Sequence, residues 1–411
     1  MSRPLHRGVL AIMGSGETSP TMVTAHRALA ARLGAGPSRA ILLDTPYAFQ
    51  ENVADISAKA VAYFRRSVGL TVEVCPATGD DDRADAAIRT ADWVFAGPGS
   101  PTYALARWEL GTTAAALRDR VRHARGLTVF ASAAAATLGR TALPVYEIYK
   151  AGAAPHWVDG LDMLAPLGLD VTVIPHYDNT EGGTHDTRYC YLGERRLSHL
   201  EGQLPPGTAV LGVDEHTAVV IDQDNGDVEI LGRGGLTVRR AGTSTVLPAG
   251  TALTLAELRA LTRDGPGVVD LVQPERVAPA APAPVTLVEL TRAGEAAFAV
   301  AAGQRDGAGM AAAILTLETA VTEWAADTEE DEGTGQSRAI LRDLVTRLGD
   351  AVAPDPLRQL RPAVEPLLAL RRDLRDRGAY GYADALRDAL TAAGLVVHDT
   401  PDGTRWSVRE S

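Results

Sequence analysis

Strand-like and helix-like segments alternate along residues 8–139, and this alternation leaves few folds open to the chain. Runs rich in β-branched and aromatic residues predict strands, and a run with helical periodicity follows each of them after a short connection. The predicted strands are GVLAIMGSGE, AILLDTPY, LTVEVCPA, DWVFAGPGS and the run that leads into Ser132. The rhythm predicts an α/β fold with a mostly parallel sheet sandwiched by helices, whose chemistry lies beyond the carboxyl ends of the strands.

One serine stands where the fifth predicted strand meets a helix, within TVFASAAAATLG at 128–139. A sharp turn there exposes Ser132 at the sheet edge and points the first helical N–H groups at whatever the serine attacks, as in a nucleophile elbow. The usual elbow has glycines where this chain has Phe130 and Ala134, and a Cβ at these positions can distort the turn. A plain structural junction is the alternative interpretation of the same residues.

Two glycine-rich turns, at 14–17 and 97–100, follow predicted strands. Neither fits a nucleotide-binding loop, because the first lacks GxGxxG spacing and the second has no GKS or GKT ending. The backbone N–H of Gly99 is instead predicted to form an oxyanion hole together with that of Ala133.

A nucleophilic serine needs a base and a group that orients the base. His176 ends the predicted strand LDVTVIPH, so we expect it at the same edge as Ser132, with Ser132 Oγ about 3–3.5 Å from a ring nitrogen. The acid candidate is Glu147 in ALPVYEIYKAG. Alone, the histidine could equally be structural and the glutamate solvated. The substrate-pocket candidates are Ser100, Tyr177, His185 and Arg188.

Composition narrows the classes of function. A net charge of −12 argues against a general nucleic-acid-binding surface but allows a local basic patch. Two cysteines, Cys75 and Cys190, provide neither a disulfide framework nor a four-ligand zinc site, and we expect no metal and no cofactor. No apolar run reaches the roughly 18 residues of a membrane span, so we expect a cytoplasmic protein.

Changes in composition and periodicity along the sequence indicate that the chain has three parts. We expect the α/β domain at 1–250, a linker at 251–285 with a short helix and the Pro/Ala-rich stretch VAPAAPAPV, and a helical domain at 286–411. Apolar residues recur at helical spacing in the last part and predict a bundle of four or five helices. The acidic run 327–332 between two of them is interpreted as a solvated loop.

Residues from about 8 to 245 resemble the peptidase E and cyanophycinase family of serine hydrolases, which is related to class I glutamine amidotransferase folds. The resemblance lies in VLAIMGSGE, AGPGSPTYAL, FASAAA, the pair His176-Tyr177, and the late segments GVDEHTAVVID and VEILGRGGLTVRR. It implies Ser132 as nucleophile, Glu147 as triad acid and His176 as base. Both elbow glycines of the family are replaced here, and cyanophycin or an Asp-X dipeptide is not carried over as substrate.

Residues 286–411 resemble the carboxyl-terminal helical domain of cysteinyl-tRNA synthetases. The matching residues are Ala383, Asp384, Leu386, Arg387, Leu390, Gly394, Asp399, Thr400, Gly403, Thr404 and Trp406. The chain has no HIGH or KMSKS motif, so we do not expect aminoacylation. Arg371, Arg372 and Arg375 are the candidates for tRNA contact, while retention of the bundle for domain packing or homodimerisation is the alternative, because this segment holds more acids than arginines.

Two functions therefore compete. In the first, Ser132, His176 and Glu147 cleave a peptide, isopeptide or ester bond in a small-molecule or peptide substrate, including a tRNA-linked one. In the second, the serine is inactive and the chain is an adaptor that binds tRNA or protein through its tail.

Overall fold

The computed structural model describes residues 8–34, 38–76, 81–180, 185–265, 286–325, 333–353, 356–400 and 403–409. The Pro/Ala-rich stretch and the acidic run both lie outside these residues. Contacts divide the chain into two compact units, Met1–Gly294 with Thr316–Ile340 and Glu295–Leu315 with Leu341–Ser411. No helix in the described parts of the chain is long and apolar enough to cross a membrane.

An eight-stranded sheet with the order β14-β11-β10-β1-β5-β4-β2-β3 forms the centre of the first unit. The five strands that come first in the sequence are parallel, as the alternating pattern predicts: β1 (Val9–Met13), β2 (Ala40–Leu43), β3 (Val72–Cys75), β4 (Trp93–Ala96) and β5 (Leu127–Ala131). The other three strands join antiparallel: β10 (Thr217–Asp222), β11 (Asp227–Gly232) and β14 (Ala252–Thr254). The sheet is therefore mixed but mostly parallel.

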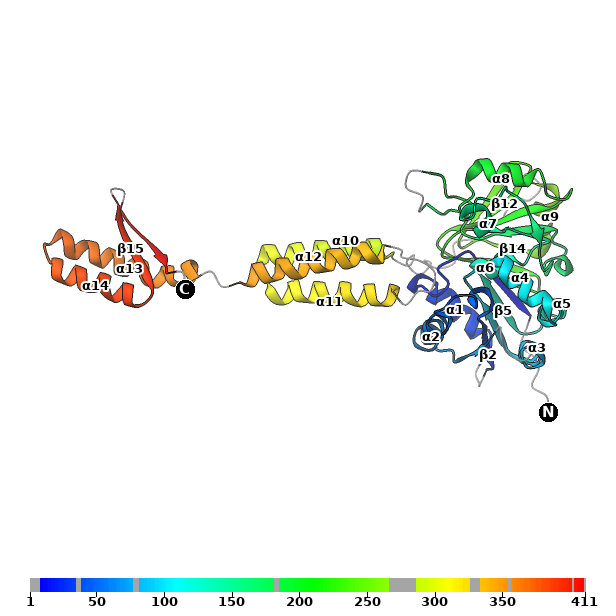
Figure 1. Ribbon diagram of the computed structural model, residues 1–411, viewed down its shortest axis with the longest axis horizontal. Helices are drawn as coiled ribbons and strands as arrows, with labels where there is room; N and C mark the ends of the chain where they lie inside the picture. Colours follow the sequence, from blue (N-terminus) through cyan, green and yellow to red (C-terminus); the bar gives the residue numbers. More distant parts are fainter. Residues whose placement is uncertain are drawn as a thin grey trace. The chain divides into compact units, whose positions relative to one another are not determined.

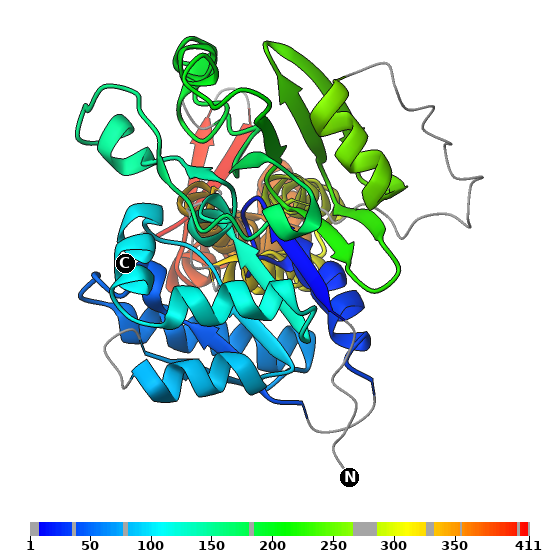
Figure 2. The ribbon, with the colours of Figure 1, turned by 90° about the vertical axis from the view of Figure 1, so that its right-hand side faces the viewer.

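Alternate residues along each parallel strand enter two separate cores, as period-2 side chains must in a sheet covered on both faces. On one face lie α1 (Val23–Ala31) and α2 (Val53–Tyr63). On the other lie α3 (Asp81–Thr90), α4 (Pro101–Leu110), α5 (Thr113–Arg122) and α6 (Ser132–Ala136). Figure 2 shows this unit facing the viewer, with helices flanking the blue and cyan strands.

A second sheet, with the order β13-β12-β9-β8, packs into the same core as α3 to α6. It consists of β8 (Val171–Ile174), β9 (Ala209–Val213), β12 (Gly235–Arg240) and β13 (Thr243–Pro248). His176 follows β8, so it comes from this second sheet and not from an additional strand of the first. Along the chain, β6 (Thr141–Ala142), α7 (Val145–Tyr149) and β7 (Val158–Asp159) come between β5 and β8, and α8 (Gly193–Glu201) comes between β8 and β9.

The packed elements of the α/β part continue past the expected end at residue 250. Strand β14 pairs with β11, and α9 (Leu255–Asp264) buries Leu255, Leu258 and Leu261 in the common core. Thr254 caps this helix with a capping box that includes Glu257, which explains where it begins. Residues 251–264 are therefore part of the folded α/β structure, not of a linker.

The rest of the described chain is helical and ends in a hairpin. Three helices, α10 (Leu287–Gln304), α11 (Gly307–Trp324) and α12 (Thr334–Val352), lie side by side, as Figure 1 shows. Two more, α13 (Pro356–Asp376) and α14 (Tyr380–Ala392), pack with the hairpin of β15 (Leu395–Thr400) and β16 (Gly403–Val408). This last group has its own small core of Val364, Leu368, Leu390 and Leu395.

Candidate active site

Ser132 lies at a sharp reversal between β5 and α6. Its φ of +47° is in the left-handed region, which a non-glycine residue adopts only at an energetic cost of about 1–3 kcal/mol. The two residues that replace the elbow glycines are accommodated: the Phe130 ring lies 5.7 Å from that of Trp108, and the Ala134 N–H donates to the carbonyl of Gly97. The turn therefore keeps the geometry of an elbow without its glycines.

His176 follows β8 of the second sheet and lies beside Ser132, which follows β5 of the first sheet. Ser132 Oγ lies 3.0 Å from His176 Nε2, within the distance predicted from the sequence. The histidine also has a positive φ, +48°, and its backbone carbonyl accepts hydrogen bonds from the N–H groups of Asn179 and Cys190. These contacts hold the imidazole close to the hydroxyl, and both side chains are largely buried.

Glu215 is the carboxylate that orients the histidine. His176 Nδ1 lies 3.0 Å from Glu215 Oε1, which also accepts a hydrogen bond from the Asn179 side chain. Burial by itself raises the pKa of Glu215, but the hydrogen bond and charge of His176, with the Asn179 bond, lower it overall. An ionised Glu215 fixes the tautomer that presents Nε2 to the serine as a proton acceptor.

The residue predicted to be this acid, Glu147, is not beside His176. It lies in α7, and its Oε1 accepts a hydrogen bond of 2.6 Å from Thr102 Oγ1. The assignment was wrong because Glu215 reaches the histidine from the loop between β9 and β10, two strands that belong to different sheets. The residues of that loop, GVDEHTA, were noted as part of the family resemblance, which was the one signal that could have found Glu215.

The two residues predicted to form an oxyanion hole both lie beside the serine. Gly99 and Ala133 line the same pocket as Ser132, and the first-turn N–H of Ala133 has no partner inside its helix. Gly99 has a φ of +129°, and a Cβ there would lie 2.1 Å from the carbonyl oxygen of Pro46. Only glycine fits this close approach, which places its backbone at the pocket wall.

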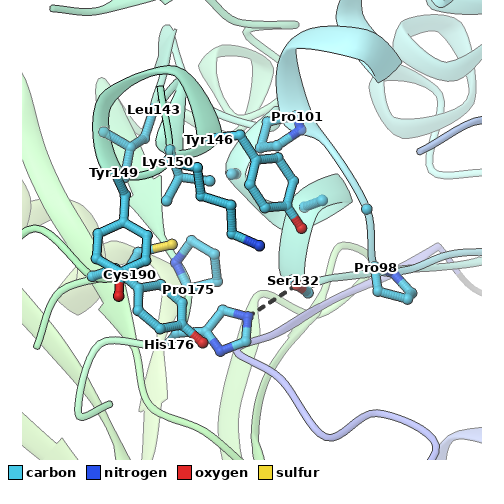
Figure 3. A pocket seen from close by; sticks show the side chains of 15 residues that line it. Pro98, Pro101, Ser132, Leu143, Tyr146, Tyr149, Lys150, Pro175, His176 and Cys190 are labelled. Carbon is cyan, nitrogen blue, oxygen red and sulfur yellow. Dashed lines mark hydrogen bonds between the residues drawn. The ribbon is translucent and has the colours of Figure 1, made fainter. Parts of the chain in front are cut away.

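The pocket over Ser132 and His176 has a volume of about 320 Å³. Its walls are apolar or aromatic apart from Ser132, His176 and one amine, and they include Leu143, Val145, Tyr146, Tyr149, Cys190 and Tyr191. Figure 3 shows the Lys150 side chain reaching across the pocket towards Ser132 and His176. Among the described residues, no carboxylate lines this pocket, so Lys150 gives its wall a positive charge.

The four substrate-pocket candidates lie elsewhere. Ser100 caps α4 by accepting from the N–H of Tyr103 and borders a neighbouring groove. Tyr177 is buried against Gly212, and burial raises the pKa of its hydroxyl. Arg188 is exposed and forms two hydrogen bonds with Asp186, and His185 is exposed beside the Tyr149 ring. The pocket is built instead by α7 and the turn 189–191, which polarity alone did not indicate.

The three tRNA-contact candidates differ in their exposure and in the ion pairs that they form. Arg371 is buried and holds Asp399 through two parallel hydrogen bonds of 2.8 Å. Arg375 bonds the same carboxylate from an exposed position, while Arg372 is exposed. Arg371 is therefore committed to holding α13 against the hairpin and is unsuited to phosphate contact.

The part of the chain that the structure describes provides no ligand set of the kind that proteins use for metal ions. Among the described residues, no group of three or more His, Cys, Asp or Glu side chains could hold a metal ion.

Comparison with solved structures supports the fold of the α/β part. A peptidase from an acI-B1 Actinobacterium superposes with a TM-score of 0.50 and 17% identity, covering 61% of this chain and 98% of that one. The fold is peptidase E-like. A candidate peptidase E protein from Listeria monocytogenes EGD-e aligns at a TM-score of 0.39 and 15% identity, over 55% of this chain and 98% of that one. The fold assignment rests on the first of the two.

Residues 357–406 match the family model of the cysteinyl-tRNA ligase anticodon-binding domain. The cysteine–tRNA ligase of Salinibacter ruber is 49% identical over 51 residues, which are 12% of this chain and 10% of that enzyme. The chain thus spans about a tenth of the length of the curated relatives that it matches, and the likeness is confined to the tail.

Proposed function

We propose that the chain is a serine hydrolase that cleaves a peptide, isopeptide or ester bond. The observation that carries this proposal is the contiguous series Ser132 Oγ, His176 and Glu215, joined by two contacts of 3.0 Å. The peptidase E-like fold and the position of the serine at a strained turn support it.

In this mechanism His176 Nε2 takes the proton of Ser132 Oγ as the oxygen attacks the substrate carbonyl. The N–H groups of Gly99 and Ala133 stabilise the resulting oxyanion, a contribution of about 3–4 kcal/mol per donor in enzymes where it has been measured. His176 then protonates the leaving group, and water releases the acyl group by the same steps in reverse. Glu215 stabilises the imidazolium throughout.

Labelling with a fluorophosphonate tests the proposal. We expect the full-length protein to be labelled at Ser132 and the Ser132→Ala variant not to be labelled. Folded wild-type protein that stays unlabelled at millimolar reagent would contradict a working nucleophile, and would leave the adaptor interpretation.

A second function is favoured for the tail, namely binding of tRNA. Besides the match to an anticodon-binding domain, Tyr380 and Tyr382 are 60% and 76% exposed, and Arg372 on the neighbouring helix α13 is exposed as well. Exposed aromatic rings beside arginines suit single-stranded bases, which stack on the rings while the cations neutralise phosphates. Together with the hydrolase proposal, such a tail favours a tRNA-linked amide or ester as the substrate.

Retention on immobilised tRNA at 0.15 M salt tests this second function. Replacing Tyr380 and Tyr382 by alanine should reduce retention at least fivefold, whereas Leu110→Ala, at an exposed site in the α/β part, should not. Equal retention of all three proteins would remove the tail tyrosines from any RNA surface.

A further inference from the structure

A second cavity adjoins the catalytic pocket and has no role in the mechanism above. It is an open groove of about 660 Å³ lined by Phe49, Gln50, Ser100, Thr102, Tyr103, Tyr146, Glu147 and Lys150. Tyr146 and Lys150 also line the catalytic pocket, so the two cavities share a wall. The two cavities are therefore neighbours, and a group attached to the scissile bond would enter the groove by extending past Tyr146 and Lys150.

Two aromatic rings form one side of this groove. The Phe49 and Tyr103 ring centroids are 5.1 Å apart, and Phe49 is 49% exposed, which is unusual for a phenylalanine. An exposed ring pair beside polar groups is a surface on which a planar heterocycle stacks.

On the polar side of the groove, hydrogen bonds run from Ser100 to Thr102 and from Thr102 to Glu147. Thr102 Oγ1 donates to Glu147 Oε1, so in the 2.9 Å contact between Ser100 and Thr102 the serine is the donor. Glu147 Oε2 is buried and has no hydrogen-bond partner in the described structure. A buried acceptor without a partner is unfavourable, and a hydroxyl or amino group entering the groove can relieve this when the carboxylate turns towards it.

Lys150 stands where the two cavities meet. It forms no ion pair with any described residue, and its amine lies 4.8 Å from the centroid of the Tyr146 ring. An unpaired amine at this position, between the scissile bond and the ring pair, is suited to an anionic group such as phosphate.

Taken together, the groove and its border with the catalytic pocket offer a stacking surface, acceptors for hydroxyl or amino groups, and one cation. These are the three features that a base, a ribose and a phosphate require. We propose that the groove binds a nucleotide that forms the leaving group of the substrate, so that the hydrolase acts on acyl nucleotides. This inference rests on the proposed hydrolase function for its chemistry but on the groove alone for its ligand.

The reaction follows from the placement. Ser132 Oγ bonds to the acyl carbon and passes its proton to His176, and the bond between that carbon and the nucleotide oxygen breaks. A sugar hydroxyl leaves with the proton from His176, whereas a phosphate leaves as an anion and His176 then releases its proton to water. Water then cleaves the acyl-serine, giving the free acid and restoring the Ser132 proton. The apolar pocket over Ser132 receives the acyl side chain.

Binding and turnover are measured separately to test the inference. Titration of AMP into the full-length Ser132→Ala protein by calorimetry should show binding, weakened at least tenfold by adding Phe49→Ala or Lys150→Ala. Lys59→Ala, the one other lysine and also exposed, is the matched control and should change the affinity less than twofold. Circular dichroism confirms that each variant is folded.

Turnover uses three substrates with the same acyl group: phenylalanine ethyl ester, the 3′-phenylalanyl ester of AMP, and phenylalanyl adenylate. We expect kcat/KM for one nucleotide substrate to exceed that for the ethyl ester at least 100-fold, and Phe49→Ala to remove most of this preference. The better of the two nucleotides distinguishes a 3′-ester from a 5′-anhydride.

The two proposals fail in different ways. Hydrolysis of all three substrates at similar rates, with no AMP binding, would overturn the nucleotide groove and leave the hydrolase. AMP binding that depends on Phe49 and Lys150, without turnover of any substrate, would support the groove and contradict the hydrolase.

Discussion

At the scale of single residues, the two glutamates near the pocket have different expected roles. Glu215→Gln keeps the shape of the side chain but removes the charge that stabilises the imidazolium, and it can present the wrong hydrogen-bonding group to His176 Nδ1. We expect kcat/KM for p-nitrophenyl acetate to fall about 10³–10⁴-fold, as in other triads that lose their acid. The measurement is the initial rate at saturating and subsaturating ester.

Glu147→Gln serves as the contrast, because this side chain contacts Thr102 and not His176. Its loss on the same ester should be at least 100-fold smaller than that of Glu215→Gln. Comparable losses would return Glu147 to the catalytic machinery and contradict the assignment of Glu215.

A site residue could be predicted from the sequence when the neighbouring residues in the chain determine its position. Ser132 was found because a strand-to-helix turn is a local pattern, and His176 because it directly follows a strand. Glu215 was missed because its position depends on how two sheets are joined, which neither periodicity nor polarity encodes. Lys150 and the tyrosine wall were missed because α7 is a five-residue helix whose direction depends on its tertiary contacts.

At the scale of elements, the turn after β4 is held by one close contact. Gly99→Ala would place a methyl group 2.1 Å from the Pro46 carbonyl at a φ of +129°. We expect about 2 kcal/mol or more of lost stability and a displaced oxyanion donor, with a matching loss of ester hydrolysis. Urea unfolding provides the stability measurement.

Gly207→Ala is the control for this substitution. Gly207 also has a positive φ, +95°, but a Cβ there meets nothing within 4 Å. It should therefore show only the backbone cost of about 1 kcal/mol and retain hydrolysis. An equally harmful Gly207→Ala would mean that the close contact at Gly99 has no special effect.

The loop between β9 and β10 makes stability depend on pH. Burial, followed by the charge of Asp178, raises the pKa of Asp214 to about 7. Because this value exceeds the unfolded value near 4, the folded state binds the proton more tightly, and the stability from this group is lost as pH rises from about 4 through 7. Allowing for solvent screening of this partly exposed group, the loss is on the order of 1–2 kcal/mol.

Asp214→Asn isolates that contribution, since asparagine mimics the protonated acid and still accepts from the Gly235 N–H. The difference in the free energy of unfolding between variant and wild type should be larger at pH 8 than at pH 5, in favour of the variant. Asp178, whose pKa burial also raises, and Glu215, whose pKa is lowered, are present in both proteins and cancel in the comparison. A difference that is independent of pH would contradict a titrating Asp214.

The elements of the parallel sheet followed from the sequence because strand and helix periods alternate there without ambiguity. Membership of the second sheet did not, since β8 reads like any other buried strand. The end of the α/β part was placed at 250 because the sequence changes composition there, yet the apolar face of α9 binds this helix to the common core.

At the scale of the whole molecule, the tail from α13 onwards has its own hydrophobic core, so its removal should not expose buried residues of the α/β part. Its buried residues Val364, Leu368, Leu390 and Leu395 contact each other and the hairpin, and the Arg371–Asp399 pair lies within the same group. A chain ending at Ala353 should therefore keep the unfolding midpoint of the α/β part and its rate with a small ester, because Ser132, His176 and Glu215 all lie upstream.

The same truncation separates the two interpretations of the tail. If the tail binds tRNA, the shortened chain should lose retention on immobilised tRNA while its mass by light scattering changes only by the residues removed. If the tail serves dimerisation, full-length protein should have twice the mass of one chain, and the shortened chain should be monomeric. Full retention of tRNA by the shortened chain would contradict the first interpretation, because the arginines and exposed tyrosines that carry it would be gone.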